Sequence, residues 1–323
     1  MNYKKLLISN RLLNTQAEKL GITCKLFNNN HLVQMSYKGK SWYFVGTRTS
    51  NQSAAGLSIA NQKPIAKELL IANDIPTARY AVANKKALAK NLFDSFNFPV
   101  VVKPVDGQQG TNVHIGVKSS NEIHKIVNTT ADTMMVEETL QGTEYRIFCV
   151  DYKFVAAAYK KPAFVIGDGE KTIKELIETK NKDPLRGTQH SSPLSKIKIN
   201  KDLIKNVTEQ LYNLNSIPKK GVEIFLRKTS NISTGGEAEN VTNTVCKENI
   251  EMFERIAKIC DLNIIGIDFM CKDLSTPVTN QKNIGVIEVN ASPGLRMHHY
   301  PSIGEPINVA KLILEMILKD YKL

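Results

Sequence analysis

Two stretches near the C-terminus alternate hydrophobic and polar positions with the period of two that is typical of a β-strand. They cover residues 263–272 and 283–290. Their apolar positions, which we expect to be buried, are Ile265, Ile267 and Phe269 in the first stretch and Ile287 and Val289 in the second. The opposite faces carry Asp268 in the first strand and both Glu288 and Asn290 in the second. Polar side chains therefore interrupt an otherwise apolar pattern in two neighbouring strands.

The residues between these strands are rich in turn formers, which favours an antiparallel hairpin. Such a hairpin would place Asp268 near Glu288, with Asn290 on the same side. Carboxylate and amide oxygens are hard ligands, and they suit Mg²⁺ bound together with a nucleotide. A solvated sheet face is the alternative interpretation of the same pattern.

The rest of the chain mixes helical and strand patterns without a regular βαβ rhythm, so we expect an α+β fold. We predict three parts: a short N-terminal α/β cap at residues 1–60, a lobe with a glycine loop at 61–145, and a lobe with the metal hairpin at 146–323. The predicted helices cover residues 63–73, 85–96, 172–181, 202–213, 248–260 and 307–319. The predicted strands include a hairpin at 31–37 and 42–45 and further strands at 99–103, 112–117, 133–137 and 146–159.

Composition narrows the classes of function. The 323 residues carry a net charge of +12 that is spread along the chain, which favours small anionic substrates such as ATP and acidic amino acids over nucleic acid. No apolar run approaches the roughly 20 residues of a membrane span, so we expect a cytoplasmic protein that does not bind membranes. The five cysteines are widely spaced and include no Cys-x-x-Cys pair, which indicates reduced, structural thiols.

Residues 100–111 end a buried strand with Lys103 and continue into a loop that contains Gly107 and Gly110. Glycine lets backbone N–H groups approach phosphate oxygens, and a lysine supplies the counter-charge. We expect this loop to fold over a triphosphate and to act as a lid, although a simple Asp-Gly turn is the alternative. The chain contains neither the P-loop motif nor the dinucleotide-binding glycine motif.

Residues 135–144 form a strand that leaves the core at Glu137 and reaches Glu144 after a bend at Gly142. A strand that exits in this way can offer backbone groups to an adenine edge, and a later carboxylate can accept hydrogen bonds from ribose hydroxyls. An ordinary acidic strand end would have the same pattern.

Two further segments supply hydrogen-bond donors. Residues 227–236 begin with Arg227, contain several hydroxyl groups and end in a Gly-Gly bend, which suits a γ-phosphate or an acyl phosphate. The segment from Ser292 through Gly294 to Arg296 follows the second metal strand directly, so we expect its amides and guanidinium near the metal. A polar loop with glycine is the alternative for the first of these segments.

Six blocks of this sequence, in the same order and with the same spacing, resemble the ATP-grasp superfamily. They are most similar to the amino-acid-ligating modules of cyanophycin synthetase and of the bifunctional glutathione synthetase fusion, from about residue 59 to the C-terminus. The blocks are residues 101–107, 142–146, 167–176, 181–187, 226–236 and 288–298.

The resemblance implies a nucleotide held between two α+β lobes, with ATP and Mg²⁺ as cofactors and Mn²⁺ as a possible substitute. By resemblance, the residues that contact the nucleotide would be Lys67, Lys103, Gly107, Gly110, Glu137, Glu138, Leu140 and Glu144. Lys63 competes with Lys67 for the first of these positions. Asp268, Glu288 and Asn290 would hold the metal ion. Arg227, Arg296, Ser292 and Gly294 would steady the transferred phosphate or the activated carboxylate.

The chemistry implied by the resemblance is ATP-dependent formation of an amide or peptide bond through an acyl phosphate. A phosphotransferase that keeps the ATP site and a non-catalytic ATP-binding module are the alternatives. The long N-terminal and C-terminal domains of cyanophycin synthetase have no counterpart here, so we expect a freestanding ligase module and not full polymer synthesis. Its expected partners are ATP and small amino-acid or peptide substrates, with a homodimer as the candidate assembly.

Overall fold

The computed structural model describes residues 6–27, 32–85, 92–107, 112–188 and 192–322. The chain divides into two units: the first contains Met1–Asn51, Ala156–Thr242 and Gly294–Leu323, and the second contains Gln52–Val155 and Asn243–Pro293. This division does not test the domain boundaries expected at residues 60 and 145, which stay predictions. None of the helices in the described ranges is both long enough and apolar enough to cross a lipid bilayer.

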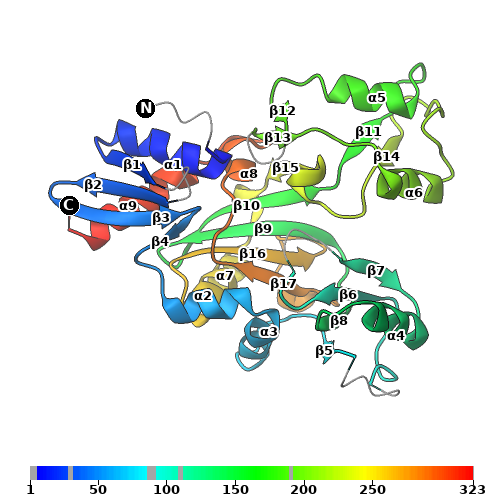
Figure 1. Ribbon diagram of the computed structural model, residues 1–323, viewed down its shortest axis with the longest axis horizontal. Coiled ribbons are helices and arrows are strands. Elements are labelled where there is room, and N and C mark those ends of the chain that lie inside the picture. The colour runs from blue at the N-terminus through cyan, green and yellow to red at the C-terminus, as the bar shows by residue number, and fades with distance from the viewer. Residues whose placement is uncertain (1–5, 28–31, 86–91, 108–111, 189–191, 323) are drawn as a thin grey trace. The chain divides into compact units, whose positions relative to one another are not determined.

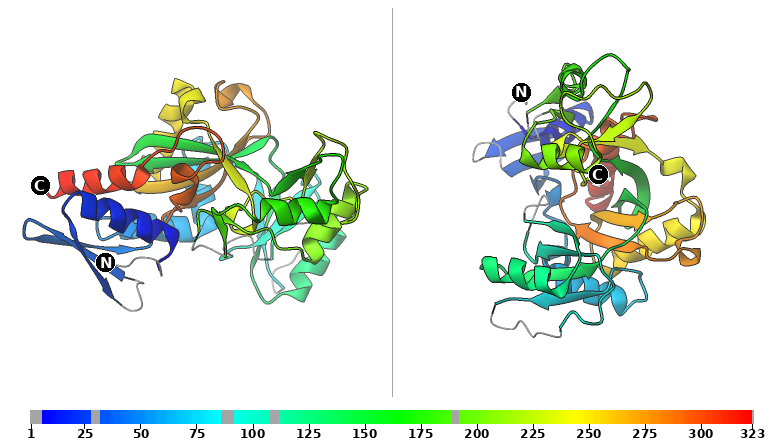
Figure 2. Two further views of the ribbon diagram at one scale, coloured as in Figure 1. Left: turned by 90° about the horizontal axis from the view of Figure 1, so that it is seen from above. Right: turned by 90° about the vertical axis from the view of Figure 1, so that its right-hand side faces the viewer.

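The two ends of the chain form one part of the first unit (Figure 1). Its elements are α1 (Ile8–Lys19), β1 (Thr23–Phe27), β2 (Leu32–Tyr37), β3 (Lys40–Val45), β4 (Arg48–Thr49) and α9 (Val309–Asp320). The four strands are antiparallel in the order β1–β2–β3–β4, which confirms the predicted hairpin of β2 and β3. Lys38 and Gly39 both adopt positive φ angles, the geometry of a two-residue hairpin turn. Helices α1 and α9 lie side by side (Figure 2), and the predicted closing helix is thereby confirmed.

The remainder of the first unit comes from two segments of the chain and contains a hydrophobic cluster of its own. The elements that lie wholly or mostly in it are β10 (Lys153–Lys161), whose first three residues belong to the second unit, β11 (Phe164–Ile166), α5 (Ile173–Lys180), β12 (Arg186–Gly187), β13 (Leu194–Ser195), α6 (Lys201–Glu209), β14 (Glu223–Phe225), β15 (Glu237–Asn240) and α8 (Arg296–His299). Thr172 and Glu175 form a capping box at the start of α5, as the expected helix requires. Helix α6 ends earlier than expected because Leu211 adopts a left-handed φ of 64°, which a helix cannot contain.

The second unit contains two antiparallel sheets. Its elements are α2 (Ala54–Asn61), α3 (Lys63–Ile71), β5 (Tyr80–Ala83), β6 (Val100–Pro104), β7 (His114–Val117), α4 (Ser120–Thr129), β8 (Met134–Glu138), β9 (Thr143–Val150), α7 (Lys247–Ile259), β16 (Ile264–Cys271) and β17 (Gly285–Asn290). One sheet has the order β5–β8–β6–β7, and in the other β16 pairs with both β9 and β17. Mixed helices and antiparallel strands confirm the predicted α+β class.

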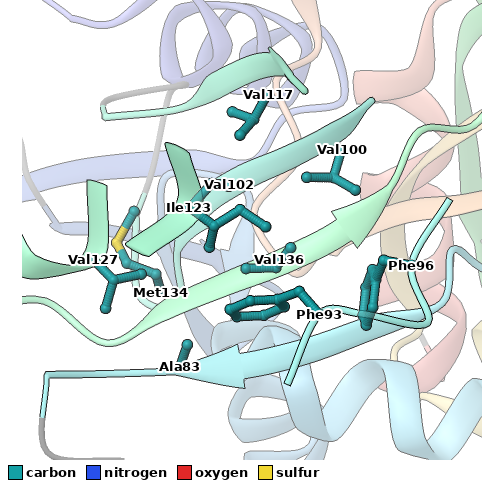
Figure 3. Packing of buried hydrophobic residues seen from close by; sticks show 10 residues of the cluster. All are labelled: Ala83, Phe93, Phe96, Val100, Val102, Val117, Ile123, Val127, Met134 and Val136. Atoms are coloured by element: carbon teal, nitrogen blue, oxygen red, sulfur yellow. The ribbon is translucent and has the colours of Figure 1, made fainter. Parts of the chain in front are cut away.

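Ile123 and Val127 of helix α4 pack with residues of the β5–β8–β6–β7 sheet in one hydrophobic core (Figure 3). The buried residues of this core are Ala83, Phe93, Phe96, Val100, Val102, Val117, Ile123, Val127, Met134 and Val136. The helix expected at 85–96 is wrong in the part that the structure describes, because residues 92–95 form a turn. Two aromatic residues three positions apart fit either a helix or a buried turn, and here Phe93 and Phe96 anchor the turn in the core. Residues 86–91 lie outside the described ranges.

Candidate active site

The predicted pair of carboxylates forms on the hairpin of β16 and β17. Asp268 lies directly across from Glu288 in the antiparallel register, and only 3% of Asp268 is exposed. A β-bulge follows this pair, because Phe269 faces Val286 and leaves Ile287 as the extra residue. The expectation that Ile287 belongs to the buried face is therefore wrong: Val286 is buried in its place, and Ile287 is half-buried. The bulge shifts the alternation by one residue while the two carboxylates stay paired.

The third expected ligand lies beside this pair. Asn290 faces Gly266 on β16, and its side-chain amide donates to a carboxylate oxygen of Glu288 at 3.3 Å. No cluster of three Asp, Glu, His or Cys side chains with metal-site geometry occurs in the described part of the chain. The predicted set is consistent with that finding, since its third member is an amide oxygen. The structure thus brings Asp268, Glu288 and Asn290 to one face of the hairpin.

An arginine that we did not assign from the sequence holds Asp268. Arg146 on β9 lies opposite Asp268, and its Nε and Nη2 atoms donate to the two carboxylate oxygens at 2.6 and 2.9 Å. Both side chains are buried. Gly266 lies close to this pair: a Cβ atom there would lie 2.6 Å from Cβ of Pro293 and 3.3 Å from Nη1 of Arg146. The sequence feature that could have indicated Arg146 is the period of two, which puts Glu144 and Arg146 on the same face of one strand.

The electrostatics of the two carboxylates, Asp268 and Glu288, favour a bound cation. Burial and the neighbouring charge of Asp268 raise the pKa of Glu288 above its ordinary value. Burial alone would lower the pKa of Arg146, but the charge and hydrogen bonds of Asp268, together with the charges of Glu288 and Glu144, outweigh burial and raise that pKa. Like charges directly opposite each other in a sheet are destabilising. Two adjacent carboxylates, one buried and one half-buried, and an amide oxygen therefore fit a small divalent cation, whose charge would relieve the repulsion.

A second cluster of charges lies in the other sheet of the same unit. The carboxylate of Glu137 on β8 pairs through Oε1 with Lys67 of α3 at 2.7 Å and through Oε2 with Lys103 of β6. At most 7% of any of these residues is exposed. Burial alone would raise the pKa of Glu137, but the charges of Lys103 and Lys67 outweigh it and hold the pKa below its ordinary value. Two cations and one anion leave a net positive charge, which suits phosphate.

A chain of hydrogen bonds links this cluster to the carboxylate hairpin. Lys67 donates to the hydroxyl of Thr77 at 2.7 Å, and that hydroxyl donates to the carbonyl of Val286 on β17 at 2.8 Å. The backbone amide of Val286 in turn donates to the carbonyl of Pro76 at 2.8 Å. The charge of Lys103 also lowers the pKa of Glu288 in opposition to burial, so the two clusters lie within electrostatic reach. Thr77 was not predicted from the sequence.

Lys63, the competitor of Lys67, holds the start of the glycine loop. Its ammonium group donates to the carbonyls of Val105 and Gly107 at 3.0 and 2.5 Å. Burial lowers the pKa of Lys63, and the charge of Glu288 opposes this effect. Gly110 lies outside the described residues, so only the beginning of the predicted loop is placed.

The expected hinge residues occupy the end of β8 and the start of β9. The carboxylate of Glu138 accepts hydrogen bonds from the backbone and side-chain amides of Asn97 at 2.9 and 3.1 Å. Leu140 is half-buried, and Glu144 lies opposite Met270 in the register of β9 and β16. Gly142 bends the chain with a φ of 115°, and a Cβ atom there would lie 2.3 Å from the carbonyl oxygen of Cys271. Only glycine fits that bend.

Two of the expected catalytic residues belong to the first unit and have different partners. Arg227 donates to the carbonyl of Lys198 at 3.0 Å and lies 3.9 Å from Asp202. Arg296 donates to the carbonyl of Ser192 and the hydroxyl of Ser195, both at 3.4 Å, and burial lowers its pKa to about 10.

The loop between β17 and α8 crosses the boundary between the units. Ser292 is exposed and belongs to the second unit, and Gly294 begins the last segment of the first. A Cβ atom at Gly294 would meet no atom of the described structure within 4 Å, so packing does not require glycine there.

Comparisons with known proteins agree with this arrangement. The RimK-like ATP-grasp domain matches residues 60–164 and 224–317. Cyanophycin synthetase from Trichormus variabilis is 35% identical over 94% of this chain and 34% of its own length. The glutathione biosynthesis bifunctional protein GshAB from Clostridium perfringens is 31% identical over 98% of this chain and 42% of its own length.

A solved structure gives the same result. The bifunctional glutathione synthetase from Pasteurella multocida superposes with a TM-score of 0.76 and 28% identity, over 98% of this chain and 44% of that protein. The chain therefore spans less than half the length of these relatives. The predicted ATP-grasp fold is confirmed, and the chain belongs to the RimK-like ATP-grasp family.

Proposed function

We propose that this protein is an ATP-dependent carboxylate-amine ligase that forms an amide or peptide bond and releases ADP and phosphate. The observation that carries this proposal is the coupling, within one unit, of a positive cluster around Glu137 to a carboxylate pair at Asp268 and Glu288. A nucleotide needs cations along its phosphates and a divalent ion between its phosphate oxygens. The names of the relatives, cyanophycin synthetase and glutathione synthetase, support amide formation between amino acids or short peptides.

The metal ligands that we propose are Asp268, Glu288 and Asn290. They would hold Mg²⁺, or Mn²⁺ in its place, through carboxylate and amide oxygens. When bound, the ion supplies charge neutralisation for the transferred phosphoryl group. In this assignment Arg146 has a supporting role, because its two hydrogen bonds fix the orientation of the Asp268 carboxylate.

The nucleotide contacts that we propose are those expected from the resemblance. Lys103 and Lys67 would contact phosphates, and the residues from Glu137 through Glu138 to Leu140 would line the adenine with their backbone. Glu144 would accept hydrogen bonds from the ribose hydroxyls, and Gly107 and Gly110 would approach the phosphates. Because the Glu137 side chain is committed to the two lysines, its contribution to the adenine would come from backbone groups alone.

For the reacting groups we propose Arg227, Arg296, Ser292 and Gly294. Their guanidinium, hydroxyl and amide groups would donate to the transferred phosphate or to the activated carboxylate. A substrate carboxylate oxygen attacks the γ-phosphorus, and the bond to the β–γ bridging oxygen breaks as ADP leaves. An amine nitrogen then attacks the acyl carbon, phosphate leaves, and the nitrogen loses a proton. No protein nucleophile is needed, because the residues position and neutralise charge.

The setting of this activity is also a proposal. We propose small amino-acid or peptide substrates, no nucleic-acid or membrane partner, and a homodimer as the candidate assembly. A cytoplasmic location is supported by five cysteines that form no disulfide bond. The proposed lobes are residues 61–145 and 146–323, preceded by a cap at 1–60.

Product analysis tests this function. Purified protein is incubated with Mg-ATP and a panel of amino acids and dipeptides, and ADP, free phosphate and new amides are measured. A ligase releases one phosphate for each amide formed. A phosphotransferase would produce ADP and a phosphorylated acceptor without free phosphate, and a binding module would bind ATP without turnover, so either result would contradict the proposal.

Replacing Lys103 with methionine is expected to weaken ATP binding. The side chain keeps a similar length, and Glu137 keeps Lys67 as its partner, so the fold should persist. Loss of a charge-assisted hydrogen bond to phosphate corresponds to about 1.5–3 kcal/mol, or roughly a tenfold to hundredfold rise in Kd. Isothermal titration calorimetry with Mg²⁺ measures it, with Lys118→Met, an exposed position after β7, as the matched control. An unchanged Kd for Lys103→Met would remove Lys103 from the nucleotide site.

A further inference from the structure

The loop at residues 227–236 ends in a tightly fitted bend. Gly235 has a φ of 102°, and a Cβ atom there would lie 2.5 Å from Cγ1 of Ile197. A Cβ atom at Gly236 would lie 2.9 Å from the carbonyl oxygen of Asn231, which already accepts the backbone amide of Gly236 at 3.2 Å. The bend therefore has one backbone conformation that its surroundings accept, and side chains around it can hold it there.

Arg186 contacts this bend directly. Its Nη1 atom donates to the carbonyl of Gly235 at 3.2 Å and to the carbonyl of Ser195 at 2.9 Å, and its Nη2 atom pairs with Glu237 on β15. Only 1% of the Arg186 side chain is exposed. Arginine has a planar fork of donors, so one guanidinium can fix a carbonyl and a carboxylate in a defined geometry.

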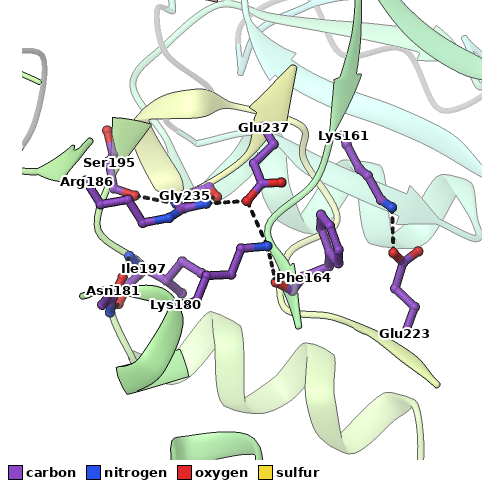
Figure 4. A network of polar contacts seen from close by, with 10 residues as sticks. All are labelled: Lys161, Phe164, Lys180, Asn181, Arg186, Ser195, Ile197, Glu223, Gly235 and Glu237. Carbon is purple, nitrogen blue, oxygen red and sulfur yellow. Dashed lines mark hydrogen bonds and ion pairs between the residues drawn. The ribbon is translucent and has the colours of Figure 1, made fainter. Parts of the chain in front are cut away.

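Glu237 is shared with a second cation (Figure 4). Lys180 at the end of α5 pairs with the same carboxylate at 2.7 Å, donates to the carbonyl of Phe164 at 2.9 Å and lies over the Phe164 ring at 3.6 Å from its centroid. Burial lowers the pKa of both Lys180 and Arg186, and Glu237 opposes this effect. One carboxylate thus joins α5, β12, β15 and the glycine bend.

A neighbouring ion pair offers a built-in comparison. Lys161 on β10 pairs with Glu223 on β14 at 2.5 Å, and its ammonium group also lies over the Phe164 ring, at 3.8 Å from the centroid. Figure 4 shows both pairs around Phe164. The Lys161–Glu223 pair links two strands but donates no hydrogen bond to Gly235. Its side chains therefore share the location and the chemistry of the Glu237 network and lack the hydrogen bond to the Gly235 carbonyl that Arg186 makes.

We propose that Glu237, acting through Arg186, is a positioning residue that fixes the Gly235–Gly236 bend and with it the segment that carries Arg227. This inference rests on the proposed function, in which Arg227 steadies the transferred phosphate or the activated carboxylate. The network touches no group assigned to the nucleotide, so it acts on the chemical step and not on ATP affinity. Its role differs from that of an ion pair that only joins α5 and β15.

The test compares Glu237→Gln with Glu223→Gln, which removes the same charge from the neighbouring pair. In steady-state assays of phosphate release with a substrate found by the panel, Glu237→Gln is expected to lower kcat at least tenfold. Its KM for ATP should stay within twofold of the wild-type value. Glu223→Gln should keep both values within twofold. Equal kcat values in the two folded variants, or a loss confined to KM for ATP, would overturn the proposal.

A second variant and a second measurement decide the matter when Glu237→Gln does not fold. Arg186→Lys keeps the charge beside Glu237 but cannot reach the carboxylate and the Gly235 carbonyl together, so it should lower kcat as Glu237→Gln does. Hydrogen–deuterium exchange of residues 227–236 should become faster in these variants and not in Glu223→Gln. Exchange that is unchanged in Arg186→Lys would refute the positioning role. An inactive wild type would contradict the proposed function alone, because the exchange measurement needs no turnover.

Discussion

Glu288→Gln is expected to abolish ATP turnover while the protein stays folded. The substitution keeps the shape of the side chain and removes one of the two proposed carboxylate ligands. A loss of at least about a hundredfold in kcat corresponds to about 2.7 kcal/mol of transition-state stabilisation, which is within the range that a metal ion supplies. Stability without Mg²⁺ should be equal or higher, because the variant removes the repulsion between Asp268 and Glu288 across the hairpin.

Phosphate release and thermal unfolding measure these two effects. The matched control is Glu251→Gln, which removes a carboxylate from α7 in the same unit, where it pairs with the exposed Lys247. The control should keep full turnover. Turnover in Glu288→Gln above about a third of the wild-type value, or loss of the fold, would contradict the assignment of Glu288 as a metal ligand.

Arg146→Gln is expected to destabilise the protein strongly and to make it dependent on Mg²⁺. Removing one partner of a buried ion pair costs about 3–5 kcal/mol, because the other charge stays buried without compensation. Here the variant would leave Asp268 next to Glu288 with less positive charge nearby. A divalent cation at this pair would replace part of the lost charge. The rise in Tm on adding Mg²⁺ should therefore be larger in Arg146→Gln than in the wild type.

Urea unfolding measures the loss of stability, and thermal unfolding with and without Mg²⁺ measures the change in Tm. Lys153→Gln is the control, because Lys153 pairs with Glu254 at 2.9 Å but 65% of its side chain is exposed. Such surface pairs contribute about 0–1 kcal/mol. An Arg146→Gln variant as stable as Lys153→Gln would contradict the prediction that Asp268 is left as an uncompensated buried charge. A rise in Tm on adding Mg²⁺ equal to that of the wild type would contradict the assignment of Asp268 as a metal ligand.

The hairpin of β16 and β17 was predictable because its information is local. Period-two alternation and a turn-rich connection fix which residues face each other, and Asp268 does lie opposite Glu288. The bulge at Ile287 was not predictable, because no residue type in the strand marks the position of the extra residue. An apolar residue looks the same whether it continues the ladder or forms the bulge.

Contacts between distant segments account for what the sequence did not reveal. Arg146 reaches Asp268 only because β9 pairs with β16, more than 100 residues later in the chain. Similarly, Glu137 was expected only as part of an adenine hinge, and nothing local indicated that its side chain joins lysines from α3 and β6. Alternation shows which face a residue occupies, but strand order decides which residue it meets. The resemblance to ATP-grasp proteins supplied the family that these isolated patterns could not.

The most direct test of the account is the position of a divalent cation in a crystal of the protein with Mn²⁺ and a non-hydrolysable ATP analogue. The anomalous difference map should show a peak within coordination distance of Asp268, Glu288 and Asn290, with the phosphates of the analogue between the ion and Lys103. A peak elsewhere, or the three side chains pointing into solvent beside an ordered nucleotide, would contradict the central claim.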